Sequence, residues 1–443
     1  MIAGHVFHRS TSRRPPLATR GEGIFIIDAD ERRYIDACGG AAVSCLGHGH
    51  PRIIAALAEQ AARLEYVHTG FFTTEASEEL ARRIARLTPG ALERVWFTSS
   101  GSEAIEAALK LARQYHLERG DSARSRVIAR RLSYHGNTLG ALAAGGSTWR
   151  RTPYAPLLFD VTLIEPCFEY HFANMGEAPE EYGRRTADAL EVEIQRLGPD
   201  TVMAFVAETV VGATAGAVPP VEGYFKRVRE ICDRYGVLLI LDEVMCGSGR
   251  TGTFLSCQQD AIVPDIATLG KGLGAGYQPI GAVICTGDVY EAVEEGSGAL
   301  KHGQTYNAHP VGCAAALAVL NAIEEEQLLE RVEQAGRRLA TLLKDRFASH
   351  RSVGDIRGRG LLQAMELVAD RETRTPFDPE LKLHEQAKKA AFSRGLLVYP
   401  GGGTVDGRCG DHILLAPPYN VTDGELEMIV DRLAETINAV LPE

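Results

Sequence analysis

The middle of the chain alternates between short apolar runs and segments whose apolar residues recur at helical spacing. Runs of strand length occur at residues 94–98, 126–129, 201–207, 237–241, 264–268 and 280–284. Helical spacing occupies residues 102–115 and 224–235. Apolar runs that alternate with helices are typical of strands covered on both faces. Between about residues 90 and 320, the pattern therefore predicts βαβ units and a mostly parallel sheet in an α/β fold.

The two ends of the chain show a mixed pattern that predicts a second, smaller domain. Residues 23–27 and 33–35 read as a hairpin. Further helices are expected over 51–61, 310–326, 327–348, 379–393 and 423–440, and further strands over 361–368, 396–398 and 413–415. We expect residues 61–325 to form a large domain and 326–443 a small α+β domain, which the N-terminal segment 1–60 joins.

Composition and charge narrow the class of protein. The net charge is −11 over 443 residues, whereas a general nucleic-acid or anionic-membrane binder needs a basic face. No apolar run approaches the ~20 residues of a membrane span, and the first residues do not resemble a secretory signal. The nine cysteines lack metal-site spacing, so buried free thiols are expected. We expect a cytoplasmic protein with no metal, membrane or nucleic-acid partner.

Lys271 and Asp242 each follow an apolar run of the predicted sheet. Lys271 comes after the 264–268 run and opens a glycine-rich turn, and Asp242 comes directly after the 237–241 run. In an open parallel sheet, the carboxyl ends of the strands meet at the edge where ligands bind. Pyridoxal phosphate (PLP) uses this pair, with a Schiff base on the lysine and an acid on the pyridine nitrogen. The alternative is a solvated salt bridge at the end of a strand.

A second signal lies where the 94–98 run turns into a predicted helix. Gly101 lets the backbone approach an anion, and Ser102 is expected to cap the helix and to offer its hydroxyl. The first amides of a helix bind phosphate, although an ordinary serine cap is the alternative. Tyr134 could stack on a flat cofactor or be a rim aromatic, and Thr305 could be a phosphate ligand or a turn residue.

Six segments, in this order, resemble the class III aminotransferases, which are PLP enzymes of fold type I, also called omega-aminotransferases. The segments are Ser100–Glu106, Tyr134–Gly136, Leu241–Val244, Gly249–Gly252, the Lys271 turn and the Thr305 segment. The resemblance covers nearly the whole chain. Each segment alone is a weak signal, but six in order are specific.

The resemblance implies a role for each site residue. Lys271 would carry the Schiff base, and Asp242 would hold the pyridine N–H. Val244 and Tyr134 would pack on the two ring faces, with Glu208 near the hydroxyl of the ring. The other implied cofactor contacts are Ser100, Gly101, Ser102, His135 and Thr305. Since the family takes this threonine from the second chain, a homodimer with shared sites is expected.

Several positions depart from relatives of the family and predict the substrate pocket. Ala213 stands where ornithine-type and 4-aminobutyrate-type relatives have a glutamate, and Gly39–Ala42 is small where amine:pyruvate relatives have a bulky aromatic. Phe71 and Phe72 could form an apolar wall or be plain core. Arg408 is the candidate for the carboxylate of the keto acid, or a solvated loop arginine. The pocket, which includes Ala42, should favour bulky or long-chain primary amines.

The sequence thus predicts an enzyme that moves an amino group from a primary amine or omega-amino compound to a keto acid, with pyruvate as the expected acceptor. Lys271 would move the proton, a role typically worth about 10²–10⁴-fold in rate. Two alternatives stay open. One is another PLP reaction on the same scaffold, by a decarboxylating transaminase or an aminomutase. The other is a PLP-binding regulator without turnover.

Overall fold

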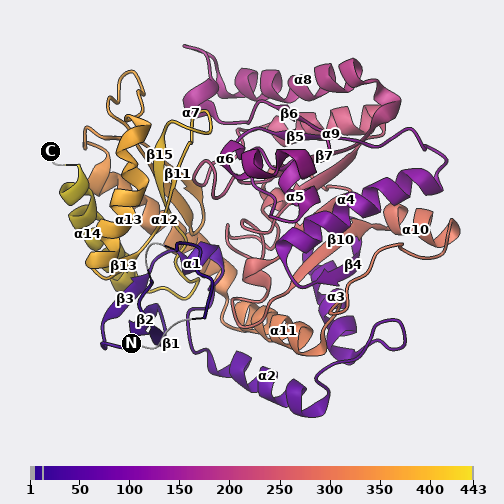
Figure 1. Ribbon diagram of the computed structural model, residues 1–443, viewed down its shortest axis with the longest axis horizontal. Coiled ribbons are helices and arrows are strands. Elements are labelled where there is room, and N and C mark those ends of the chain that lie inside the picture. The colour runs from indigo at the N-terminus through magenta and orange to yellow at the C-terminus, as the bar shows by residue number, and fades with distance from the viewer. Residues whose placement is uncertain (1–4, 12–13, 442–443) are drawn as a thin grey trace.

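A seven-stranded sheet forms the centre of the molecule (Figure 1). The computed structural model describes residues 5–11 and 14–441. The sheet contains β4 (Leu92–Thr98), β5 (Arg126–Arg130), β6 (Val161–Ile164), β7 (Val202–Glu208), β8 (Leu238–Asp242), β9 (Ile266–Leu269) and β10 (Gly281–Thr286), in the order β4-β10-β9-β8-β7-β5-β6. Strands β6, β5, β7, β8 and β9 pair in parallel, and β10 is antiparallel to both neighbours. The predicted mostly parallel sheet is confirmed.

Helices cover both faces of this sheet because successive side chains of each strand point to opposite sides. Phe205 and Leu239 belong to the apolar cluster of α8 and α9. The next residues, Val206 and Ile240, belong to the cluster of α4, α5 and α10. The bounds are α4 Gly101–Glu118, α5 Leu139–Ala144, α8 Pro179–Leu197, α9 Tyr224–Tyr235 and α10 Gly287–Glu295. Each central strand is therefore buried on both faces, as its continuous apolar run predicted.

A long helix, α11 (Pro310–Glu325), leads away from the sheet toward the smaller part of the molecule. It packs against α2 (Pro51–Arg63) and α3 (Glu75–Leu87), and α2 lies along its outer side in Figure 1. The next helix, α12 (Leu328–Phe347), packs on the C-terminal strands. The predicted helix after Pro51 and the predicted exit helix are both confirmed.

The smaller part combines both ends of the chain in two four-stranded sheets, at the left of Figure 1. Its elements are β1 (Ala18–Glu22), β2 (Phe25–Asp28), β3 (Arg33–Asp36), β11 (Val353–Arg359), β12 (Leu362–Leu367), α13 (Leu383–Ser393), β13 (Leu396–Leu397), β14 (Tyr399–Gly402), β15 (Asp411–Leu415) and α14 (Asp423–Val440). The orders are β1-β2-β3-β13 and β11-β12-β15-β14. The predicted N-terminal hairpin is present, and β13 extends its sheet. The domain limits at residues 60 and 325 stay a prediction.

The structure divides one predicted helix and adds several short ones. The helix expected over 379–393 consists of a turn, Pro379–Leu381, and α13, because Lys382 between them has a left-handed φ of 47°. The remaining short helices are α1 (Gly39–Ala42), α6 (Thr148–Arg151), α7 (Glu169–Phe172), and the 3₁₀ turns Thr152–Leu157, Pro199–Thr201, Ser256–Asp260 and Lys271–Leu273. Segments this short show too few repeats for a helical period to be read from sequence.

Candidate active site

Three strand ends bring Glu208, Asp242 and Lys271 to one edge of the central sheet. Glu208 and Asp242 are the last residues of β7 and β8, and Lys271 lies two residues beyond the end of β9. Lys271 has a φ of 42°, a left-handed conformation that is uncommon outside glycine. A cavity of about 140 Å³ opens at this edge. It is lined by Ser100, Gly101, Ser102, Tyr134, His135, Gly136, Glu208, Val210, Ala213, Asp242, Val244, Met245 and Lys271.

The N-terminus of α4 forms one end of this cavity. Ser100 is the cap, because its Oγ accepts a hydrogen bond from the Glu103 amide at 3.2 Å. The predicted cap, Ser102, is wrong, since the helix already begins at Gly101. The Ser102 Oγ instead accepts from the Asn137 amide at 3.1 Å. The amides of Gly101 and Ser102 lie in the first turn, where no helical carbonyl precedes them, so they suit an anion.

Asp242 is held at the floor of the cavity by two donors. His135 Nδ1 lies 2.8 Å from Oδ2, and the Val244 amide donates to Oδ1 at 3.0 Å. A carboxylate only accepts, so His135 carries its proton on Nδ1. These contacts fix the orientation of the carboxylate, and both side chains are buried.

Burial shifts the two other titratable groups of the edge in opposite directions. It raises the pKa of Glu208, although the amides of Tyr134 and Gly212 donate to this carboxyl at 3.0 and 2.9 Å. Burial lowers the pKa of Lys271, an effect that the nearby Asp242 and Glu208 oppose in part. A lysine whose pKa is lowered loses its proton more readily, and the resulting neutral amine is both a nucleophile and a base.

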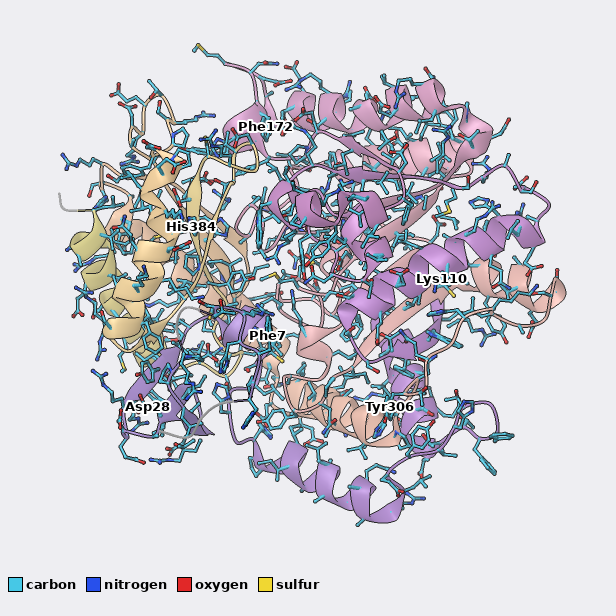
Figure 2. The ribbon with its side chains drawn as sticks, in the orientation of Figure 1. Phe7, Asp28, Lys110, Phe172, Tyr306 and His384 are labelled. Atoms are coloured by element: carbon cyan, nitrogen blue, oxygen red, sulfur yellow. The ribbon has the colours of Figure 1, made fainter. Side chains whose placement is uncertain are left out.

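Three of the predicted site residues lie on the surface, outside this cavity. Thr305 is exposed, and its carbonyl accepts from the Tyr66 hydroxyl at 2.9 Å; the neighbouring Tyr306 is labelled in Figure 2. Phe71 and Phe72 are 81% and 67% exposed, so the alternative that they are plain core is wrong for this chain. A contribution of these residues to a site would require a second chain.

The two other predicted pocket residues lie close to the cavity without lining it. Ala42 is buried with a φ of 60° and packs in the cluster of Val210 and Met245, directly behind the cavity wall. Arg408 lines a second cavity of about 410 Å³, which shares Ala213 with the first. Its guanidinium is exposed and lies 3.6 Å from the Glu380 carboxylate.

Sequence reasoning missed three residues of the cavity wall. Gly136 lies inside the recognised segment Tyr134–Gly136 but was given no role, and Met245 follows directly after the segment that ends at Val244. Val210 lies two residues beyond Glu208, in a loop with no motif of its own. No signal in the sequence marked Val210.

The described residues contain neither a group of metal ligands nor a membrane-spanning helix. Within residues 5–11 and 14–441, no three histidine, cysteine or acidic side chains group as metal ligands would. The same residues include no helix that combines the length and apolar character needed to cross a bilayer. All nine cysteines are free thiols, and eight of them are buried, as expected.

Residues 7–437 match the family model for aminotransferase class III. The chain belongs to the class III aminotransferases. An uncharacterized aminotransferase of Schizosaccharomyces pombe is 44% identical over 438 residues, 99% of this chain and 95% of the relative. Among solved structures, a thermostable (S)-enantioselective omega-transaminase from Thermomicrobium roseum superposes with a TM-score of 0.92, at 35% identity over 99% of this chain and 97% of that one.

A further solved structure bears on the cofactor. The omega-transaminase from Pseudomonas jessenii in complex with PMP superposes with a TM-score of 0.90, at 34% identity over 96% of this chain and 93% of that one. Class III aminotransferases use pyridoxal phosphate, and this aminotransferase is a PLP enzyme of fold type I.

The residues of the smaller cavity fit this cofactor. A Cβ added at Gly136 would come within 2.5 Å of Ser102 Oγ, and one at Gly101 within 2.6 Å of Val244, so the backbone at both positions approaches the wall closely. An amide-rich helix start suits a phosphate, an anchored carboxylate suits a protonated ring nitrogen, and a buried lysine suits an aldehyde carbon. All three lie around one cavity.

Proposed function

We propose that this aminotransferase transfers the amino group of a bulky or long-chain primary amine, or of an omega-amino compound, to a keto acid, with pyruvate as the acceptor. The observation that carries the proposal is the pair of adjoining cavities. Lys271, Asp242 and the start of α4 line the smaller one, and Ala213 lines both. A donor longer than an α-amino acid has room there.

Each residue of the smaller cavity takes one part in holding the cofactor. The amides of Gly101 and Ser102 would bind the phosphate, with Ser100 capping the helix that presents them. Tyr134 and Val244 would lie against the ring. Thr305 of the partner subunit would complete the phosphate site, which makes a homodimer the working unit. We place the enzyme in the cytoplasm, where its free thiols stay reduced.

The chemistry of the bound group requires a proton on its ring nitrogen. Bound pyridoxal phosphate supplies an electron sink that stabilises the electron pair left when a substrate carbon loses a proton. Asp242 would hold the proton on the ring nitrogen, and His135 would keep the carboxylate turned toward it. Such a charge-assisted contact is stronger than a neutral hydrogen bond.

Lys271 would move the proton of the substrate. In its neutral form, Nζ would accept the proton from the substrate carbon that bears the nitrogen, and it would deliver this proton to the cofactor carbon bound to the same nitrogen. The low pKa that burial gives Lys271 favours the neutral form. Glu208, pinned by the amides of Tyr134 and Gly212, would fix the hydroxyl side of the ring.

The volume of the larger cavity, about 410 Å³, supports a large donor. The backbone of residues 401–403, all glycines, forms part of its wall, and Ala213 contributes only a methyl group where the cavities meet. Each methylene of a donor buried there would contribute about 0.8 kcal/mol. The acceptor keto acid is small by comparison, and Arg408 at the far rim is a candidate to attract its carboxylate.

A donor screen tests this proposal. Purified enzyme is incubated with pyruvate and a series of primary amines, and alanine is quantified. We expect alanine to form fastest with bulky or long-chain donors, without release of CO₂. Borohydride reduction should fix the cofactor to Lys271, as mapped by mass spectrometry. An adduct on another lysine, or a preference for 4-aminobutyrate or ornithine over bulky amines, would contradict the proposal.

A further inference from the structure

Arg150 has no carboxylate partner within the part of the chain that the structure describes. It lies on α6, half buried, with its guanidinium carbon 4.8 Å from the centre of the Tyr134 ring and 4.3 Å from that of Trp149. These rings hold the guanidinium plane by cation–π contact but leave its N–H donors free. The next residue, Arg151, points elsewhere and donates to the Gly145 carbonyl at 3.1 Å.

Arg150 lines the larger cavity. The other charged residues of this wall are Arg408 and Glu385, and Arg408 already lies 3.6 Å from the Glu380 carboxylate. His384, labelled in Figure 2, has its Nδ1 2.6 Å from Asp411 Oδ1. Among the described residues that line this cavity, Arg150 is thus the cationic side chain without a carboxylate partner.

We propose that Arg150 binds a carboxylate carried by the substrate at a position remote from the reacting carbon, so that it determines specificity for donors with a distal carboxylate. The proposal rests on the proposed function and deepens it. Arg150 contacts the Tyr134 ring, which would itself cover the cofactor ring, and Arg150 does not line the smaller cavity. Its guanidinium therefore lies outside the cavity that would hold the cofactor, and a carboxylate bound there must be several bonds from the reacting nitrogen.

Arginine suits this role better than lysine would. A guanidinium presents paired N–H donors in one plane, which matches the two oxygens of a carboxylate, and it can do so while stacked on an aromatic ring. An ammonium offers charge without this fork. Hydrogen bonds to charged groups support a preference of about 10- to 100-fold for the donor that bears the carboxylate.

The test compares two donors of equal chain length, 6-aminohexanoate and hexylamine, with pyruvate as acceptor. The kcat/KM of each is measured for the parent enzyme, for Arg150→Gln and for Arg150→Lys. The matched control is Arg119→Gln, because Arg119 also lies over a tyrosine ring, 5.3 Å from the centre of Tyr115, but outside both cavities. A second readout, independent of turnover, is calorimetric binding of hexanoate to the same holoenzymes.

We expect the parent to prefer 6-aminohexanoate, and Arg150→Gln to reduce this preference about 10- to 100-fold through KM, with hexylamine unchanged. Arg150→Lys should restore part of this preference, and Arg119→Gln should leave it intact. Hexanoate binding should weaken most in Arg150→Gln, less in Arg150→Lys, and not at all in Arg119→Gln. Equal losses on both donors, no preference in the parent, or unchanged hexanoate binding would overturn the proposal. If no donor yields alanine but hexanoate binding depends on Arg150, the proposed function fails and this inference stands.

Discussion

Glu208 and Asp242 are directly paired residues on the adjacent parallel strands β7 and β8, so two carboxyl groups lie side by side at the edge of the sheet. The two carboxyl groups have different surroundings. Asp242 accepts from the His135 ring and the Val244 amide, whereas the pKa of Glu208 is raised by burial. Pairs of titratable groups whose environments differ in this way can take different roles in one reaction.

The Asp242→Asn variant tests the role of the first carboxyl. An amide cannot hold the cofactor ring nitrogen protonated as a carboxylate does, and its NH₂ group would face the donor Nδ1 of His135 if oriented wrongly. We expect the variant to retain bound cofactor, measured by visible absorbance after gel filtration, and to lose at least about 100-fold in kcat. Turnover within a few-fold of the parent would show that Asp242 does not have this role.

Cofactor uptake by the apoenzyme should depend on pH through Lys271. Lys271 must be a neutral amine to form a bond with the cofactor. The pKa of a free lysine is about 10.4, and burial lowers the pKa of Lys271, so its neutral form predominates at a lower pH. We expect the uptake rate, followed by absorbance, to rise with pH and to level off below that value. A rate that still increases tenfold per pH unit up to pH 10 would contradict the lowered pKa.

Mixing two inactive variants tests the shared site. In a hybrid of Lys271→Ala and Thr305→Ala chains, one site would lack both residues and the other would be intact, provided that Thr305 acts across the interface. We expect mixing, after subunit exchange, to restore up to about half of the parent activity per hybrid dimer, in line with one intact site of two. Fully active isolated monomers would refute the shared site.

The junction of the two cavities offers a test of donor size. Ala213 lines both cavities, so Ala213→Leu would take space from each and should lower kcat/KM for long or branched amines by at least about tenfold more than for a small amine, since the larger side chain displaces donor methylenes. Ala42→Trp is less informative, because Ala42 is buried at a φ of 60° and a large residue there would disturb packing for every donor. Equal losses for all donors in Ala213→Leu would argue against the wide-pocket model.

Acid should destabilise the protein partly through His412. Burial, followed by the nearby Arg357, lowers the pKa of His412 to about 3. Unfolded histidine titrates near 6.5, so between these values the unfolded chain binds the extra proton and the free energy of unfolding falls as the pH falls. Denaturant titrations at several pH values give the free energy of unfolding as a function of pH. Between pH 6.5 and 5, this free energy should change less steeply with pH in His412→Gln than in the parent, by up to about 1.4 kcal/mol per pH unit. Parallel pH profiles of parent and variant would contradict this.

The sequence located the chemistry at the strand ends because a parallel sheet brings these ends together by geometry. Asp242 and Gly101 needed only the correct strands and one helix start, which the apolar pattern supplied, whereas Glu208 was named only through the resemblance to class III aminotransferases. The cap at Ser100 was misplaced by two residues because both serines are good caps, and spacing alone could not choose between them.

The substrate side was less predictable, because it is built from segments that meet only in the folded chain. Arg150 and Gly401 line one cavity from positions 251 residues apart, the difference between 401 and 150, and no local pattern relates them. Arg408 was singled out from its loop, yet it lies on the rim with an acid beside it. Likewise, the exposure of Phe71 depends on what packs around it, which residue type does not reveal.

The parallel pairing of Leu396 in β13 with Ile35 in β3 has a consequence for how the chain assembles. The N-terminal hairpin leaves the ribosome long before its fourth strand exists, so its sheet stays open during most of synthesis. Closing a loop of this length is slow, and unpaired strand edges invite association with other chains. The N-terminal strands therefore keep an open edge that a chaperone could shield during synthesis, until residues 396–397 arrive to pair with β3.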